Sequence, residues 1–223
     1  MKIACLQFNP IQENTYVVWD DTLEAVVIDA GNSNPREDAA LDNFIAEHGL
    51  RPVLAANTHG HFDHTLGVAH LKKRYGIPFA MSLKDAFLLD NASTSGSIFG
   101  VPVGEMPSVD TDLDTTPEIR FGHTVLRVLR TPGHTPGHTG YRLEAGDTSL
   151  LIWGDIVHFP SIQSARPEAS VAFDVDPEQA RRTREILLRQ AASERWLIAG
   201  MHLGLPGFAR VENTASGYCL RSV

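Results

Sequence analysis

The chain has 223 residues, 43% of them hydrophobic, and a formal net charge of -8 at pH 7. This acidity, without a basic run or a basic patch interleaved with aromatic residues, argues against nucleic acid or anionic membrane as a partner. No apolar stretch approaches the roughly 20 residues that span a bilayer, no signal-peptide profile is present, and two cysteines are too few for a disulfide framework. A globular protein of the reducing cytoplasm is expected.

The first part of the chain alternates short apolar runs with amphipathic segments, which predicts strands alternating with helices. The expected elements are strands at 2–8, 15–19 and 25–29, a helix from 34–35 to about 48, a strand at 53–56, a helix from about 66 to 75–76, a strand at 77–81, and a helix capped by Ser82 that runs through Leu89. Residues 91–117, rich in Gly, Ser, Thr, Pro and Asp, are expected to form a long functional or disordered loop.

Strands resume near Ile119 in the second part of the chain, and three of the later strand-like runs end at a potential metal ligand. The run 124–130 leads into Thr131-Pro132-Gly133-His134-Thr135-Pro136-Gly137-His138, the run 150–155 ends in Asp155, and the run 196–202 ends in His202. Asp176-Pro177 begins a last helix through about Ala192, because a capping residue precedes proline at the first helical position. These strand ends are expected to converge on one pocket.

Three histidines and an aspartate fall within six positions of the segment Thr58-His59-Gly60-His61-Phe62-Asp63-His64. Buried imidazole and carboxylate groups are costly without partners, and four together would repel or stay unpaired unless a cation lay between them. The irregular loop follows a strand and can turn two of these groups to each side, which indicates two adjacent metal ions. The alternative is a solvated histidine-rich loop that binds metal only adventitiously.

These features together resemble the metallo-β-lactamase superfamily, whose His-x-His-x-Asp-His signature stands at 59–64. The resemblance implies an α/β fold, a four-layer αβ/βα sandwich over residues 1–223 as a single domain of two αβ halves, with a dinuclear metal site at one edge. It assigns His59, His61 and His134 to the first metal, Asp63, His64 and His202 to the second, and Asp155 as the bridge. His134 is preferred to His138, because members with a doubled Pro-Gly-His use the first histidine.

The two halves resemble different branches of that superfamily, with a seam near residues 131–140. The first half is similar to glyoxalase-II-like hydrolases in the runs 9–16 and 28–31, and the second to the methyl parathion hydrolase group in the runs 153–158, 172–176 and 202–207. A chimera, made by natural or engineered recombination, is one hypothesis, and an intermediate lineage is another.

Two close divalent metals lower the pKa of a water held between them, so the predicted enzyme attacks its substrate with a metal-bridging hydroxide. Zinc suits the nitrogen-rich ligand set, although manganese, iron and cobalt can occupy such sites. Asp63 is expected to orient the nucleophile and to carry a proton afterwards. Asp29 and His138 are expected to support the metal loops, and His158 is expected either to face the substrate or to make a loop contact.

The preferred substrate is a small neutral molecule, namely a carboxylic ester, a lactone or a phosphotriester, as the methyl parathion hydrolase resemblance implies. Candidates for an apolar pocket wall are Phe87, Ile98, Phe99, Phe159 and Phe173. The alternative is a glyoxalase-II-like thioesterase, and a β-lactamase or a persulfide dioxygenase is less favoured. Residues 98–103 are apolar enough to be covered by a ligand or by the partner in a homodimer.

Overall fold

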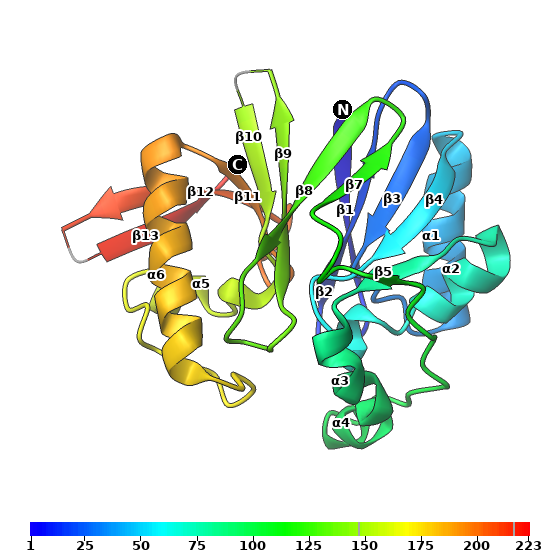
Figure 1. Ribbon diagram of the computed structural model, residues 1–223, viewed down its shortest axis with the longest axis horizontal. Coiled ribbons are helices and arrows are strands. Elements are labelled where there is room, and N and C mark those ends of the chain that lie inside the picture. Colours follow the sequence, from blue (N-terminus) through cyan, green and yellow to red (C-terminus); the bar gives the residue numbers. More distant parts are fainter. Residues whose placement is uncertain (147, 216) are drawn as a thin grey trace.

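Two β-sheets pack face to face, and helices cover the outer side of each sheet (Figure 1). The computed structural model describes residues 1–146, 148–215 and 217–223. Helix α6 (Pro177–Glu194) lies on one outer face, and α1 (Pro35–Glu47) and α2 (Val68–Tyr75) lie on the other. The αβ/βα order of layers predicted from the sequence is confirmed.

The first sheet comes from the N-terminal half and has the strand order β1-β2-β3-β4-β5-β6 within the described residues. Its strands are β1 (Lys2–Phe8), β2 (Glu13–Trp19), β3 (Glu24–Ile28), β4 (Arg51–Ala56), β5 (Phe79–Met81) and β6 (Thr111–Asp112). The first two pairings are antiparallel, and the pairings from β3 to β6 are parallel. Since α1 and α2 cross over between parallel strands, β3, β4 and β5 all end at the same edge of the sheet.

The second sheet comes from the C-terminal half and has the order β13-β12-β11-β10-β9-β8-β7 within the described residues. Its strands are β7 (Glu118–Phe121), β8 (Thr124–Arg130), β9 (Thr139–Ala145), β10 (Thr148–Ile152), β11 (Leu197–Ala199), β12 (Phe208–Thr214) and β13 (Gly217–Ser222). Only β10 and β11 pair in parallel among these described strands, with α6 as their crossover helix. The chain segments after β10 and β11 therefore leave at one common edge.

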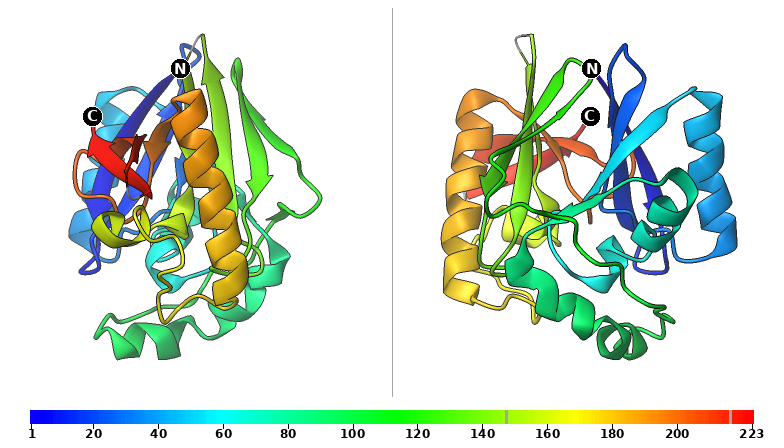
Figure 2. Two further views of the ribbon diagram at one scale, coloured as in Figure 1. Left: turned by 90° about the vertical axis from the view of Figure 1, so that its left-hand side faces the viewer. Right: turned by 45° about the vertical axis from the view of Figure 1, so that its right-hand side comes forward.

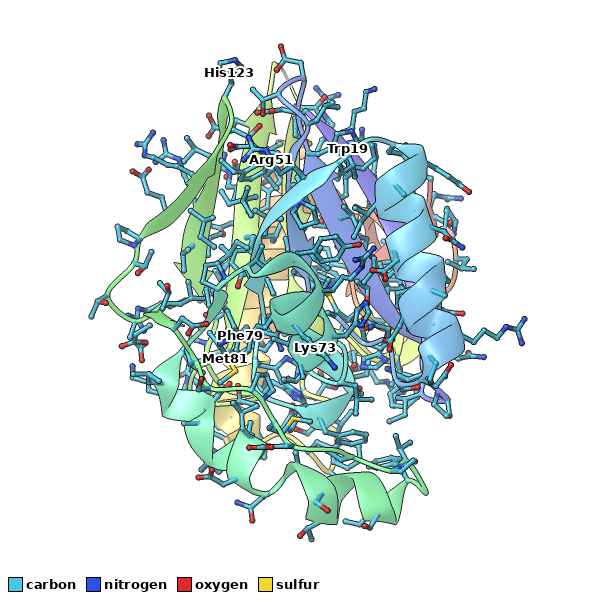
Figure 3. All side chains as sticks on the ribbon, turned by 90° about the vertical axis from the view of Figure 1, so that its right-hand side faces the viewer. Trp19, Arg51, Lys73, Phe79, Met81 and His123 are labelled. Atoms are coloured by element: carbon cyan, nitrogen blue, oxygen red, sulfur yellow. The ribbon has the colours of Figure 1, made fainter. Side chains whose placement is uncertain are left out.

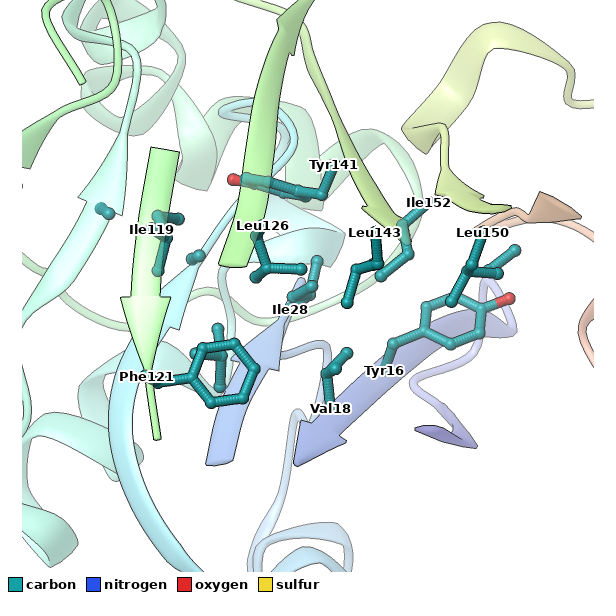
Figure 4. Packing of buried hydrophobic residues seen from close by; sticks show 14 of the residues in the cluster. Tyr16, Val18, Ile28, Ile119, Phe121, Leu126, Tyr141, Leu143, Leu150 and Ile152 are labelled. Carbon is teal, nitrogen blue, oxygen red and sulfur yellow. The ribbon is translucent and has the colours of Figure 1, made fainter. Parts of the chain in front are cut away.

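The principal core fills the space between the two sheets. Tyr16, Val18 and Ile28 of the first sheet meet Leu126 and Leu143 of the second (Figure 4). Alternate residues of the same strands turn outward, so that Trp19, Phe79 and Met81 pack with the helices on the other side of the first sheet (Figure 3). A third apolar cluster joins α6 to β10 and β11. This alternation gives each sheet two buried faces.

The edge of the sandwich away from the chain termini is closed by short helices (Figure 2). They are α3 (Ala86–Asp90), α4 (Ala92–Ile98) and α5 (Pro160–Gln163). No helix among residues 1–146, 148–215 and 217–223 combines the length and apolar character that a bilayer crossing requires.

Several sequence-based expectations about elements are corrected. The predicted loop at 91–117 contains α4 and β6, and α4 is held by Ala92 packing against Phe62 and Val101. Its sequence, ASTSGSI, has low helix propensity, so packing rather than local preference forms it. The helix expected after Ser82 is a 3₁₀ turn followed by the short α3. The strands expected at 150–155 and 196–202 end at 152 and 199.

Candidate metal centre

The predicted ligands lie in loops that directly follow four strands. The loop after β4 carries residues 57–64, the β8–β9 connection carries 131–138, Asp155 follows β10, and His202 follows β11. Gly154 has a φ of +63°, and a Cβ there would lie 2.5 Å from Nε2 of His138. Only glycine therefore allows the chain to turn so that Asp155 faces the other loops.

His59, His61, His134 and Asp155 form one cluster of side chains. Nδ1 of His61 lies 2.8 Å from Nε2 of His59 and 3.1 Å from Nε2 of His134. Oδ2 of Asp155 lies 3.7 Å from Nε2 of His59 and 3.6 Å from Nε2 of His134. For comparison, two ligands at tetrahedral positions around one zinc ion are about 3.4 Å apart, given zinc–nitrogen bonds of about 2.1 Å.

Asp63, His64 and His202 form a second cluster that shares Asp155 with the first. Nε2 of His64 lies 3.5 Å from Oδ2 of Asp63 and 3.4 Å from Oδ2 of Asp155. Nε2 of His202 lies 3.9 Å from Oδ2 of Asp63 and 3.2 Å from Oδ2 of Asp155. One carboxylate oxygen of Asp155 therefore stands between two sets of ligand atoms.

The hydrogen bonds around these clusters orient the imidazoles of His64 and His134. Nδ1 of His64 contacts Oδ2 of Asp29 at 3.0 Å, and Nδ1 of His134 contacts Oδ1 of Asp174 at 2.9 Å. In the neutral form of each imidazole, the carboxylate accepts the proton of Nδ1 and Nε2 carries a lone pair that can bind a cation. Nε2 of His64 is buried with no hydrogen-bond partner in the structure. A cation in each cluster would satisfy these atoms, and the residues therefore fit divalent metals.

The electrostatics of the clusters point the same way. Burial lowers the pKa of His59 and of His61 well below the usual value, which keeps both imidazoles neutral. Burial by itself would also lower the pKa of His64, but Asp155, Asp63 and Asp29 raise it well above the usual value. The carboxylates that favour a proton on His64 would equally favour a metal cation beside it.

A family model described as the metallo-beta-lactamase superfamily matches residues 8–202. The chain belongs to the metallo-beta-lactamase superfamily. Among its relatives, the probable metallo-hydrolase YqgX of Bacillus subtilis is 31% identical over 159 residues, which cover 70% of this chain and 72% of the relative. The hydroxyacylglutathione hydrolase GloC of Haemophilus influenzae is 31% identical over 143 residues, 63% of this chain and 66% of the relative. The chain is thus a metal-dependent hydrolase of this superfamily.

Solved structures with the same fold include the BLEG-1 B3 metallo-beta-lactamase, which has 25% identity and a TM-score of 0.73 over 91% of this chain and 92% of its own. TTHA1623 in a di-iron-bound form has 24% identity and a TM-score of 0.72 over 90% and 92%. AidC, a dizinc quorum-quenching lactonase, has 17% identity and a TM-score of 0.70 over 94% and 78%. The latter two likenesses concern the fold alone.

Asp29 supports the metal loop of this superfamily member from the end of β3, where the sequence predicts a supporting role. Its carboxylate accepts hydrogen bonds from the backbone N–H and the hydroxyl of Thr58, each at 2.6 Å, besides its contact with His64. Asp29 has a φ of +51°, a left-handed conformation that is unfavourable for most residues and that these three hydrogen bonds offset.

His138 and His158 differ in what they contact. Nε2 of His138 accepts the backbone N–H of Asp155 at 3.0 Å, and Nδ1 lies 2.7 Å from the hydroxyl of Thr131. Both ring nitrogens of His138 already have partners within the protein. The ring of His134 enters the cluster instead, with Nε2 beside the other candidate ligands. Nε2 of His158 lies 2.9 Å from Oδ2 of Asp155, and its ring stacks on that of His202 with centroids 5.1 Å apart. His158 also lines the adjacent pocket.

Sequence reasoning missed two buried carboxylates that hold the metal loops. Asp174 contacts His134, and Asp85 accepts hydrogen bonds from the backbone N–H of Gly60 at 3.2 Å and of Gly137 at 2.7 Å. Asp174 lies in the run 172–176, one of the runs that resemble the methyl parathion hydrolase group. Nothing in the spacing of this run indicates a metal ligand or a residue that supports one. Asp85 lies in a helical context, where an aspartate ordinarily faces solvent, so nothing in the sequence singles it out.

The N-terminal run 9–16 contributes further supports. The side-chain amide of Asn9 donates to the carbonyls of Gly31 and Asp63, both at 3.0 Å. The amide of Asn14 donates to the carbonyls of Gly200 and Leu203 at 3.0 and 2.6 Å, on either side of His202. This segment therefore fixes loops from both halves of the chain.

A pocket of about 670 Å³ opens over the clusters, and His61, Asp63, Asp155 and His202 form its floor. Its walls are mainly apolar and come from the β1–β2 turn, the 3₁₀ turn at 62–64, α4, α5, the segment before α6 and the loop after β11. They include Ile11, Phe62, Ile98, Phe99, Phe159, Ile162, Val171, Phe173 and Leu203. Four of the five predicted wall residues line it, and Phe87 does not. No lysine or arginine occurs among the described lining residues.

Proposed function

We propose that this chain hydrolyses uncharged esters, that is, carboxylic esters, lactones or phosphotriesters, at two divalent metal ions. The observation that carries the proposal is the pocket, which joins a floor of metal-binding groups to apolar walls without a cationic side chain among the described lining residues. Such walls favour apolar groups of a neutral substrate. A substrate with several carboxylates or phosphates would lose hydration along these walls, where none of the described lining residues is a lysine or arginine that could pair with them.

We assign the ligands to two metals as the resemblance implies, and the two side-chain clusters support this assignment. His59, His61 and His134 would hold one metal, Asp63, His64 and His202 the other, and Asp155 would bridge them, with zinc preferred and manganese, iron or cobalt possible. When bound, two such ions lower the pKa of a water and polarise the substrate oxygen.

The protein side chains supply position and proton transfer. Asp63 lies on the pocket floor and contacts His64 and His202, so its carboxylate can orient an attacking water and accept its proton. His158 lines the same pocket, with Nε2 2.9 Å from Oδ2 of Asp155, and can contact the substrate or the leaving group. The apolar walls exclude water around the reacting bond, which strengthens these polar interactions.

A glyoxalase-II-like thioesterase is the second candidate, because one relative is named hydroxyacylglutathione hydrolase GloC. The metal centre would serve a thioester equally well, so the two candidates differ only in the pocket. A glutathione thioester carries two carboxylates, and no lysine or arginine occurs among the described lining residues to pair with them.

The test is a substrate panel assayed after metal analysis. Protein loaded with zinc or manganese would be given an aryl ester, a lactone, a phosphotriester and S-lactoylglutathione, with Asp155→Ala as the inactive control. Turnover of one or more of the first three with a higher kcat/KM than the thioester supports the proposal. Rapid thioester cleavage without ester, lactone or phosphotriester turnover would replace it with the second candidate.

A further inference from the structure

Arg184 is a buried arginine on α6, the helix behind the second sheet. Only 1% of its surface is exposed, which makes it one of the largest fully buried side chains among the described residues. A guanidinium is rarely buried, because it loses strong hydration unless its N–H groups find acceptors. Its partners therefore show what it stabilises.

All the partners of Arg184 lie in the connection between Asp155 and α6. Nε donates to the carbonyl of Ile156 at 2.6 Å, and one terminal nitrogen donates to the carbonyls of Pro167 and Ala169 at 2.6 and 3.1 Å. The other terminal nitrogen lies 3.5 Å from Oδ2 of Asp174. The side chain of Arg184 therefore binds residues near the start, in the middle and near the end of this connection.

This connection also forms much of the pocket wall. Phe159, Ile162, Val171 and Phe173 line the pocket, and the described part of the segment between Ile156 and α6 has only the single-turn α5 as regular structure. Few backbone ladders therefore fix its path. The position of these four side chains depends on the polar groups buried beneath them.

Gln163 is a second buried anchor under the same wall. Its carbonyl accepts the backbone N–H groups of His158 and Phe159 at 2.7 and 3.0 Å, and its amide donates to the carbonyl of Ala169 at 3.0 Å. Arg184 and Gln163 therefore meet at the carbonyl of Ala169. Together they form a polar layer between α6 and the apolar wall.

We propose that Arg184 is a positioning residue that sets the shape of the apolar pocket and thereby the size of the substrate group that the pocket accepts. This inference rests on the proposed ester hydrolysis for its kinetic readout. The planar fork of a guanidinium can bind three carbonyls and a carboxylate in fixed directions, whereas a lysine ammonium at the same place cannot span them. Arg184→Lys should therefore release the wall while retaining the positive charge.

The first measurement compares two esters with one leaving group. In metal-loaded Arg184→Lys, KM for para-nitrophenyl octanoate should rise about tenfold or more, in the range that a misfitted apolar pocket produces. KM for para-nitrophenyl acetate should change much less, since an acetyl group buries far less apolar surface than an octanoyl chain. Metal content is measured for each variant, because Arg184 contacts Asp174, which in turn contacts His134. Arg182→Lys is the matched control, because Arg182 is an exposed arginine on the same helix.

A second measurement does not depend on turnover. Hydrogen exchange of the amides at 157–174 should accelerate in Arg184→Lys and stay unchanged in both sheets, and the non-hydrolysable para-nitrophenyl octyl ether should bind about tenfold more weakly. If the wild type hydrolyses neither para-nitrophenyl ester, the substrate panel decides the proposed function separately, while exchange and ether binding still decide the role of Arg184.

Two outcomes would overturn the inference. One is Arg184→Lys with wild-type exchange at 157–174 and an unchanged KM ratio for the two esters. The other is faster exchange throughout both sheets with equal losses for both esters, which shows a general structural role. If Arg184→Lys does not fold, Gln163→Met tests the same polar layer, and its failure to change the KM ratio would count against the proposal in the same way.

Discussion

The carboxylate of Asp85 accepts the backbone N–H of Gly137 at 2.7 Å. The same side chain accepts the backbone N–H of Gly60 at 3.2 Å and the hydroxyl of Thr135 at 2.6 Å. Gly60 lies between two predicted ligands of the β4 loop, and Gly137 lies in the β8–β9 connection. One buried carboxylate therefore joins the loop after β4 to the β8–β9 connection, in which the predicted seam lies.

Asp85→Asn should weaken the metal centre without touching a ligand. An amide offers one acceptor oxygen in place of two, so at least one of the three donors faces the amide N–H₂ and loses its partner. Leaving a buried donor unsatisfied costs about 1–3 kcal/mol of unfolding free energy. Chelator competition should also show weaker metal binding, because the loops are no longer held in register.

Asp90→Asn is the control for that substitution, since Asp90 is an exposed acid in the same helical segment. It should alter neither the chemical denaturation midpoint nor the metal affinity. If Asp85→Asn behaved like Asp90→Asn in both measurements, the role given to Asp85 would be wrong.

The fold class and the seven candidate ligands were accessible from the sequence because their signals are local. The motif at 59–64 is contiguous, and His134, Asp155 and His202 each follow an apolar run. The geometry brings all seven together, although which metal each one binds stays a prediction. The chimera hypothesis and the seam near 131–140 also stay predictions.

The supporting residues were not accessible, because their roles depend on tertiary contacts between distant segments. Asp85 and Asp174 look like ordinary surface acids, and Arg184 sits in a helix rich in charged residues. The strands β9, β12 and β13 were also not predicted. Each of them mixes polar and apolar residues without a strong local pattern. These strands owe their stability to pairing with neighbouring strands, which the sequence alone does not show.

Removal of metal should destabilise the fold by a large amount. Without cations, Nε2 of His59 and Nε2 of His134 both crowd Nδ1 of His61, and Nε2 of His64 stays unpaired in the protein interior. A ligand that binds only the folded state adds about 4 kcal/mol at a free concentration a thousandfold above its Kd. Thermal denaturation with excess chelator should give a clearly lower Tm, which returns on addition of zinc or manganese. An unchanged Tm would contradict a resident metal at these clusters.

Asp155→Ala should remove the group shared by both clusters. Its Oδ2 lies within 3.7 Å of ligand nitrogens from His59, His64, His134 and His202, so its loss separates the two clusters. We expect kcat to fall on the order of a thousandfold, as when a principal electrostatic group is deleted, and metal stoichiometry to fall below that of the wild type. Circular dichroism should show the same secondary structure. Full turnover in this variant would refute the bridging assignment.

His138 should make the stability of the metal-free protein depend on acid pH. Burial of the ring and, next, the neighbouring His134 lower its pKa from 6.5 to about 3. The unfolded chain therefore binds a proton below pH 6.5 that the folded chain does not bind. The contribution of neutral His138 is fully present above pH 6.5 and is lost as the pH falls from 6.5 toward 3.

His138→Gln removes this titration and keeps an acceptor for the backbone N–H of Asp155. Urea denaturation of chelator-treated protein should be measured at pH 7.5 and pH 5, which lie on the order of one unit or more to either side of the ordinary histidine pKa. Between these two pH values, the wild type should lose more unfolding free energy than the variant. His123→Gln, at an exposed position, should behave like the wild type. Equal pH dependence in the wild type and His138→Gln would mean that His138 titrates alike in both states, and its buried neutral role would have to be abandoned.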